Sequence, residues 1–161
     1  MNAEVRATPH AMVRLDIPTT MSFRDFRRAF EAAAPAFDAE EVQQLLARGG
    51  TWDDIRAAAE RNAPHGLMVY ATIDIGQLMT AAGHAGHCVE YLLGNHMVAE
   101  RMFRHDPATA LYVPLRVVIQ AGPDDLGDLH SRPAQQRVRR PRPARDHGRR
   151  RGVRPQSRAT P

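Results

Sequence analysis

Apolar side chains recur at regular intervals up to about residue 121, and beyond it this regularity stops. Before that point the intervals match either the 3.6-residue repeat of a helix or the two-residue repeat of a strand. The remainder is rich in arginine and proline and contains no aromatic residue. Such a segment buries too little apolar surface to offset roughly 1–2 kcal/mol of backbone entropy per ordered residue. We therefore expect a flexible N-terminus over 1–10, one folded domain over 11–121 and a disordered tail over 122–161.

The charge divides at the same place. Residues 1–121 hold 11 arginines against 14 acidic residues, a net of −3, and residues 122–161 hold 11 against 4, a net of +7. The positive excess lies in the tail, which predicts non-specific attraction to nucleic acid or another polyanion. No aromatic side chain is interleaved there for base stacking. The arginines expected to contact phosphates are Arg137, Arg139, Arg140, Arg142 and Arg149 to Arg151.

Two features bear on the compartment. The single cysteine, Cys88, cannot form an internal disulfide, so nothing in the sequence calls for an oxidising environment. The chain shows no signal-peptide pattern and no apolar run near the roughly 20 residues that span a bilayer. We expect a cytoplasmic protein that does not enter a membrane.

Helical patterns dominate the first half of the domain. Start signals of the form Ser/Asp/Thr followed three residues later by an acid occur at Ser22, Asp38 and Thr51. Each precedes apolar residues at helical spacing, which predicts one helix over about 23–34 and two more after Asp38 and Thr51. Glycines at 49 and 50 and Pro64 mark the ends of the second and third helices.

Strand patterns dominate the second half of the domain, and one further strand pattern precedes the first helix. The alternation in Met12–Ile17 predicts a half-buried strand that Pro18 ends. The apolar run Leu67–Ile73 predicts a strand in the centre of the sheet. Two further strands, two helices and an irregularity at Pro114 complete the prediction. These strands are Cys88–Leu93 and Leu111–Ile119, and the helices span about 75–82 and 96–104, the latter with Val98, Ala99, Met102 and Phe103 inward.

Several short motifs in the second half resemble a known family. They are Tyr91-Leu92-Leu93-Gly94-Asn95, Ala99-Glu100-Arg101-Met102-Phe103, Asp106-Pro107 and Leu111-Tyr112-Val113-Pro114-Leu115-Arg116-Val117-Val118-Ile119. Together they resemble the bacterial family called domain of unknown function 302. The resemblance implies an α+β fold with a curved antiparallel sheet packed with helices, of the TATA-box-binding-protein-like type. It also implies frequent pairing as a homodimer and no established reaction.

The chain departs from the family pattern at two places. His96 stands where the family tends to have proline, a change that a helix start tolerates. After the Pro-Leu strand the family continues with a turn, another strand and a helix, whereas this chain turns arginine-rich at Gly122. We therefore expect a sheet that is incomplete at its C-terminal edge. We also hypothesise that the tail is non-homologous, from a shifted reading frame or another source.

Candidate reactive groups gather around Cys88. His84, His87 and Cys88 are metal-ligand types at close spacing, with His96 and His105 further along. No paired Cys-x-x-Cys or His-Glu-x-x-His frame accompanies them, and on a strand His87 and Cys88 would face opposite sides. Cys88 is also a candidate nucleophile if His87 lowers the pKa of its thiol. The alternative reading is loop histidines beside a small buried thiol.

Other chemistry has less support in the sequence. Asp74 and Glu90 are candidates for general acid and base if a cleft joins them, although nothing in their spacing requires it. No phosphate loop, serine elbow or dinucleotide motif indicates a cofactor. The function predicted is a non-catalytic ligand-binding or protein-interaction module. The alternative is a metal- or thiol-dependent enzyme that uses His84, His87 and Cys88.

Overall fold

The computed structural model describes residues 5, 7–9, 11–122 and 124–132. Five strands form one antiparallel sheet in the order β1-β5-β4-β3-β2. The α+β class and the antiparallel sheet packed with helices are thus confirmed. The strands are β1 (Leu15–Ser22), β2 (Met68–Asp74), β3 (Cys88–Gly94), β4 (Leu115–Ala121) and β5 (Leu126–Arg132). The helices are α1 (Phe23–Ala33), α2 (Ala39–Ala47), α3 (Trp52–Asn62), α4 (Ile75–Thr80), α5 (His96–Phe103) and the 3-10 helix η1 (Pro107–Tyr112).

The helices begin where their capping residues place them. The side chains of Ser22, Asp38 and Thr51 each accept a hydrogen bond from the backbone three residues on, at the starts of α1, α2 and α3. At α3 the bond is reciprocal, because the Asp54 carboxylate accepts from the Thr51 backbone N–H at 2.8 Å. Local hydrogen bonding therefore explains why the sequence predicts these three helix starts correctly.

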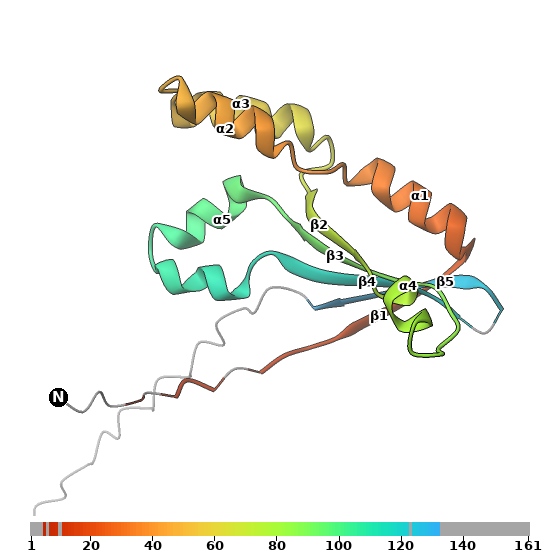
Figure 1. Cartoon of the computed structure of the whole chain (residues 1–161). Helices are drawn as coiled ribbons and strands as arrows, with labels where there is room; N and C mark the ends of the chain where they lie inside the picture. Colours follow the sequence, from red (N-terminus) through yellow and green to blue (C-terminus); the bar gives the residue numbers. More distant parts are fainter. Residues whose placement is uncertain (1–4, 6, 10, 123, 133–161) are drawn as a thin grey trace, which may run out of the picture.

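Helix α1 covers one face of the sheet, where it contacts β1, β4 and β5 (Figure 1). The main core lies between α1 and the central strands, with Phe23 of α1 buried among strand residues such as Val89, Tyr91 and Ile119. Helices α2 and α3 pack together, and α3 ends near β2, where Met68 is buried beside Ala59 and Ala63 of the α3 segment. Burial is thus concentrated on the α1 side of the sheet.

The predicted domain boundary at residue 121 is wrong. Strand β5 follows a turn after Gly122 and pairs with β4 on one side and β1 on the other, so the sheet is complete at this position. The apolar periodicity failed here because the helix-facing positions of β5 are Gly127, Leu129 and Ser131. A Cβ on Gly127 would lie 3.0 Å from the Phe26 ring, so the α1 aromatic side chain fills the space that β5 leaves. Main-chain pairing on both sides, rather than side-chain burial, holds this strand.

When the boundary is placed after Arg132, the net charges of the domain and the tail differ more than before. Residues 1–132 hold 12 arginines and 17 acidic residues, a net of −5, and residues 133–161 hold 10 arginines and one aspartate, a net of +9. The hypothesis that foreign sequence begins at Gly122 is wrong for the β5 segment. The predicted disorder of 133–161 and the flexibility predicted for most of 1–10 lie outside the described residues, and so do the tail arginines from Arg137 onward.

Two predicted strand positions also need correction. Proline 18 lies within β1 and does not end it, because β1 is an outer strand and its register with β5 shifts between Pro18 and Ser22. Strand β2 lies at the opposite edge of the sheet and not in the centre. Its burial comes from the segment after α1, where Phe37 N–H donates to Val69 O and Val69 N–H donates to Pro35 O, both at 2.8 Å.

The fourth predicted strand and the fifth helix differ in detail. Residues 107–112 form η1, and β4 starts at Leu115, immediately after a cis peptide bond between Val113 and Pro114. Proline therefore precedes the strand and creates neither a bulge nor an edge within it. On α5, Val98 and Phe103 are both 53% exposed, so they do not face the core as predicted.

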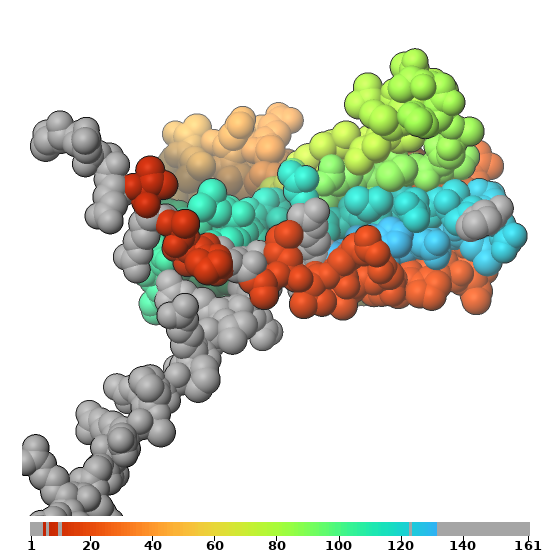
Figure 2. All heavy atoms as spheres, turned by 90° about the horizontal axis from the view of Figure 1, so that it is seen from below, coloured from red at the N-terminus to blue at the C-terminus, as the bar shows by residue number. Residues whose placement is uncertain are grey.

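The second face of the sheet lies away from α1. Strands β1, β5, β4 and β3 run side by side across the view in Figure 2, and Figure 1 shows α1 on the other side of the sheet. This open face, as we call it, is made by alternate strand residues that include Glu90, Val118 and His130. Among the described residues, no helix has the length and hydrophobicity needed to cross a membrane.

Candidate functional site

A depression of about 560 Å³ lies where α1, the loop before β3 and the turn between β4 and β5 meet. The α1 site, as we call it, joins segments that are about 100 residues apart in the chain. Its lining is mostly charged, with arginine the commonest residue type. The lining residues are Phe23, Arg24, Arg27, Arg28, Glu31, His87 and Asp125.

The α1 residues reach the site through helical spacing. Arg24 and Arg28 are four residues apart, as are Arg27 and Glu31, so these side chains share one side of the helix. Phe26 and Phe30, on another side, pack against the core. The apolar spacing that predicts α1 gives no sign of this cluster, because the arginines lie on another side of the helix. Three arginines at three- and four-residue spacing were the available signal.

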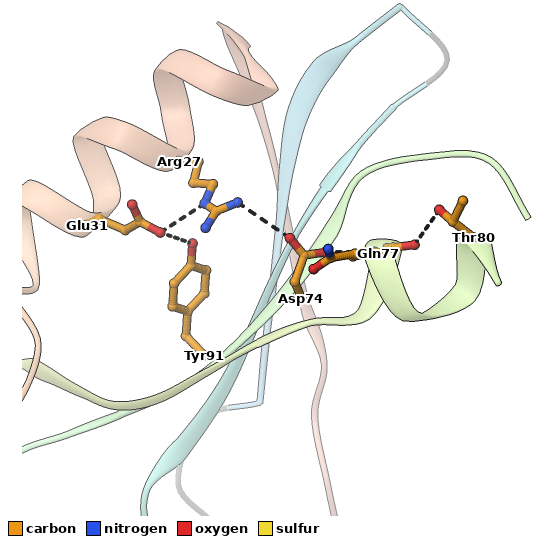
Figure 3. Close-up of polar contacts among 7 residues, drawn as sticks. Arg27, Glu31, Asp74, Gln77, Thr80 and Tyr91 are labelled. Atoms are coloured by element: carbon orange, nitrogen blue, oxygen red, sulfur yellow. Dashed lines mark hydrogen bonds and ion pairs between the residues drawn. The ribbon is translucent and has the colours of Figure 1, made fainter.

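Arg27 joins the α1 site to the interior of the domain (Figure 3). Its Nε donates to Glu31 Oε1 at 2.9 Å, and the buried Tyr91 hydroxyl donates to the same oxygen at 2.8 Å. The far end of the guanidinium, Nη1, lies 3.8 Å from Asp74 Oδ2. Asp74 is itself fixed by capping α4, where Oδ1 accepts from Gln77 N–H at 2.8 Å. Four elements, α1, β2, β3 and α4, thus hold one guanidinium in place.

The electrostatics of this network favour its charged form. Burial opposes ionisation of Glu31, but hydrogen bonds from Arg27 and Tyr91 outweigh it and lower the pKa of the carboxyl. The hydrogen bond to Glu31 raises the pKa of Arg27 against the effect of burial. Burial and then the hydrogen bond to Glu31 raise the pKa of the Tyr91 hydroxyl. At neutral pH the network holds one carboxylate, one guanidinium and a neutral phenol.

The other two arginines of the α1 site are on the solvent side. Arg28 lies 3.0 Å from the Asp25 carboxylate, which balances its charge. Arg24 is exposed, and no ion pair joins it to any residue that the structure describes. Since Arg27 is also paired, Arg24 is the arginine of the site that contacts no carboxylate of the described residues, and Asp125 adds a carboxylate to the same lining.

An aromatic wall bounds the site beside these arginines. The rings of Phe23 and His87 stack with centroids 5.0 Å apart and an interplanar angle of 15°. Phe23 is buried beneath, and His87 is exposed. The turn at Asp125 closes the site, because Asp125 O accepts from Phe23 N–H at 2.9 Å. The arrangement therefore offers a flat ring surface next to a free guanidinium.

The structure does not bring the predicted metal or thiol group together. His87 stacks on Phe23 on the α1 side, whereas Cys88 shares the open face with Gln120, its partner in register. His84 and His105 are exposed at other places. No three histidine, cysteine or acidic residues of the described segments lie close enough to hold a metal ion. Burial, aided by the charges of two nearby carboxylates, raises the pKa of Cys88, which opposes a nucleophilic thiolate.

The predicted acid–base pair is also divided by the sheet. Asp74 lies opposite Val89 in register and points toward α1. Glu90 lies opposite Ile73 and Val118 on the open face, where it pairs with Arg116 at 3.2 Å. Because neighbouring strand positions face opposite sides, these two carboxyl groups cannot act on one substrate atom.

His96 has a structural environment. Its Nδ1 lies 3.0 Å from the Tyr70 hydroxyl, and its ring meets those of Phe37 and Trp52 edge-on, with centroids 5.6 and 6.3 Å away. Burial lowers the pKa of the imidazole, so the neutral form is favoured at pH 7. This cluster joins α5 to β2 and α3 and lies apart from the α1 site.

Comparison with known proteins identifies the family. The sequence model for "Domain of unknown function DUF302" matches residues 47–129, which is just over half of the chain. The chain belongs to the DUF302 family. No curated protein matches it. It is similar to the crystal structure of an uncharacterised conserved DUF302 protein from Bacillus stearothermophilus, with a TM-score of 0.49, 11% sequence identity, and coverage of 75% of this chain and 73% of that one.

The extent of the family match bears on both the tail and the site. It reaches Leu129, so most of β5 is DUF302 sequence. His87 and Asp125 of the α1 site lie within the match, whereas α1 precedes it. The family match thus includes His87 and Asp125 of the α1 site, and it does not include the three arginines of α1.

Proposed function

We propose that this DUF302 protein is a non-catalytic module that binds a small organic anion in the α1 site. The observation that carries the proposal is that Arg24, which forms no ion pair with a residue that the structure describes, lines the same depression as the exposed ring of His87. A carboxylate or similar group on a planar ligand would pair with the guanidinium while its ring lies against the imidazole. The charge of Arg27 is balanced by Glu31 at 2.9 Å and Asp74 at 3.8 Å, so we assign the charge of the ligand to Arg24.

Three observations support binding over catalysis. The pKa of Cys88 is raised, and Asp74 and Glu90 lie on opposite faces of the sheet. Glu31, the carboxylate that lines the α1 site, has a lowered pKa and is hydrogen-bonded by two donors, which makes it a poor general base. The alternative of a metal-dependent enzyme predicts stoichiometric metal in purified protein. Replacing His84 and His87 with alanine would then remove that metal.

The binding proposal is tested with benzoate as the probe and neutral benzamide as its matched control. Calorimetry on the wild-type chain should detect benzoate but not benzamide. The Arg24→Met variant should lose at least about tenfold in benzoate affinity, since a charge-assisted hydrogen bond contributes about 1.5–3 kcal/mol. Arg101→Met, on α5 outside the α1 site, is the control and should bind as wild type. Equal binding of benzoate and benzamide, or an unaffected Arg24 variant, would contradict the proposal.

We also propose that the protein self-associates as a homodimer, as the family resemblance implies. The outer edge of β1 supports this, because an unpaired strand edge is a site for addition of another strand. Sedimentation equilibrium of the full chain tests it. A mass of one chain over the micromolar range would contradict it.

For the tail we propose weak, non-specific binding of polyanions. The ten arginines among residues 133–161 support this proposal, because arginine side chains neutralise phosphates in contacts that depend steeply on salt. Replacing Arg149, Arg150 and Arg151 with glutamine should lower the salt concentration that elutes the protein from heparin. A preference for one nucleic-acid sequence would contradict non-specific binding.

For the whole protein we propose a cytoplasmic location. Cell fractionation tests this location.

A further inference from the structure

The two edges of the sheet are closed to different degrees. Strand β2, at one edge, is bridged by residues 35–37, whose backbone exchanges two hydrogen bonds of 2.8 Å with Val69. Strand β1, at the other edge, pairs with β5, and among residues 11–122 and 124–132 no second strand pairs with it. The outer backbone of β1 therefore presents a ladder of donors and acceptors that a further strand can pair with.

The side chains of this edge are apolar on one face. Leu15 and Ile17 of β1, and Val13 two residues before the strand, alternate along the chain and are 44%, 48% and 61% exposed. Between them lie Arg14, just before β1, and Asp16, which form an ion pair of 2.9 Å within the chain, and Asp16 also contacts His130 of β5 on the opposite face. The edge thus combines an open main-chain ladder, an exposed apolar row and one charge of each sign.

We propose that a second copy of the chain adds to this edge, so that two β1 strands pair antiparallel about a two-fold axis at Leu15. Leu15 then lies opposite Leu15 of the partner copy, and Val13 lies opposite Ile17 of the partner copy. Arg14 lies opposite Asp16 of the partner copy, and the symmetry repeats both contacts. This inference rests on the proposed homodimer and adds its surface and register.

Charge selects this register over its neighbours. A two-fold axis at Asp16 would place two carboxylates directly opposite each other, and an axis at Arg14 would oppose two guanidinium groups. Like charges at directly opposed positions destabilise an antiparallel pair, and opposite charges stabilise it. The axis at Leu15 lies between these two alternatives and places Arg14 opposite Asp16 of the partner copy twice. Pro18, which has no backbone N–H, and the register shift that follows it limit the pairing to the segment around Leu15.

Cysteine cross-linking tests the register in a Cys88→Ser background, which removes the native thiol. Leu15→Cys should give a disulfide-linked dimer on mild oxidation, because directly opposed strand residues have Cα atoms about 4.5–5.5 Å apart. Ile17→Cys is the matched control. In the proposed register two such cysteines are offset by four residues, roughly 13 Å, which is too far for a disulfide. A mixture of Val13→Cys and Ile17→Cys chains should cross-link to each other.

The outcomes separate this inference from the homodimer itself. A dimer in sedimentation without a Leu15→Cys cross-link, or with equal cross-linking of Ile17→Cys, would overturn the β1 register and leave the homodimer standing. A monomer in sedimentation would overturn both. Cross-linking of Leu15→Cys alone, together with the mixed pair, supports the register.

Charge exchange gives a second readout that does not depend on cysteine chemistry. Arg14→Asp should weaken dimerisation about tenfold, since two favourable cross-strand pairs become two repulsive ones. Adding Asp16→Arg restores unlike charges across the axis and should recover the affinity. Thermal unfolding of each variant shows that the domain still folds. Failure of the double variant to dimerise better than Arg14→Asp alone would overturn the register.

Discussion

The two faces of the sheet use polar residues in different ways. On the α1 face, polar groups form a connected network in which the fully buried Tyr91 supports Glu31 and Arg27, and Arg27 reaches Asp74. On the open face, Glu90 pairs with Arg116 and Asp16 pairs with His130, as separate contacts in which Arg116 and Asp16 are the exposed partners. The α1 face also holds the main apolar core.

This difference indicates a division of roles between the faces. A side chain on the α1 face is surrounded by packed atoms, so its removal leaves a cavity or an unpaired polar group. A side chain on the open face is replaced by water when it is removed. The α1 face therefore carries the stability of the domain and shapes the α1 site. The following predictions test that contrast.

The largest expected effect comes from two neighbouring valines on β4 that face opposite sides. Val117 is 3% exposed on the α1 face, and Val118 is half-buried on the open face. Val117→Ala should lower the free energy of unfolding by about 2 kcal/mol, because it creates a cavity in packed surroundings. Val118→Ala should cost less than about 1 kcal/mol. Urea denaturation measures both, and equal losses would remove the distinction between the faces.

A second matched pair concerns glycines near β5. Gly127→Ala would place a Cβ 3.0 Å from the Phe26 ring, and relieving that contact should cost about 1–3 kcal/mol. At Gly122 the nearest atom to an added Cβ is a carboxylate oxygen of Asp128 at 3.2 Å, which can rotate away. Gly122→Ala should therefore cost distinctly less by thermal unfolding. A harmless Gly127→Ala would show that α1 does not pack closely on β5.

Tyr91→Phe removes one donor from the network and keeps the ring. We expect a loss of about 1–2 kcal/mol in the free energy of unfolding, because Glu31, whose side chain is 43% exposed, loses a hydrogen bond from the buried Tyr91. Glu90→Gln, the control on the open face, should change stability by less than about 1 kcal/mol, since its partner Arg116 is 63% exposed. A larger effect from Glu90→Gln would reverse the comparison.

The smallest effect concerns acid stability through Asp16 on the open face. Its hydrogen bond with His130 holds the pKa of Asp16 below the ordinary 3.8. A lowered folded-state pKa contributes stability that is present above the unfolded value and is lost as the pH falls through the folded one. Stability should therefore fall below about pH 4, with a slightly shallower slope in Asp16→Asn. Urea midpoints from pH 5 to pH 2 measure this, and an unchanged slope would contradict the pairing.

Local sequence signals predicted a large part of this fold. The starts of α1, α2 and α3 follow from capping side chains that bond to backbone within three residues. The α+β class and the DUF302 family followed from the spacing of apolar residues and from the motifs around Gly94 and Pro114. These features depend on contacts between residues that are close in sequence, so a linear pattern contains them.

Strand order and the candidate site could not be obtained in the same way. The strand β5 has one large apolar residue, Leu129, among its helix-facing positions, and it persists because β1 and β4 satisfy its backbone on both sides. The edge position of β2 depends on a bridge from the segment after α1. The α1 site joins Arg24 to His87 and Asp125, and no periodicity connects residues so far apart.

The sequence alone therefore determined the helix starts, the general class and the family, because capping bonds and apolar repeats act over a few residues. Tertiary structure alone decided that β5 belongs to the domain, that β1 lies at an edge of the described sheet, and that no acidic residue of the described segments pairs with Arg24. The physical reason is that main-chain pairing is indifferent to side-chain type, and that charge balance at a site depends on which distant segments the sheet brings together.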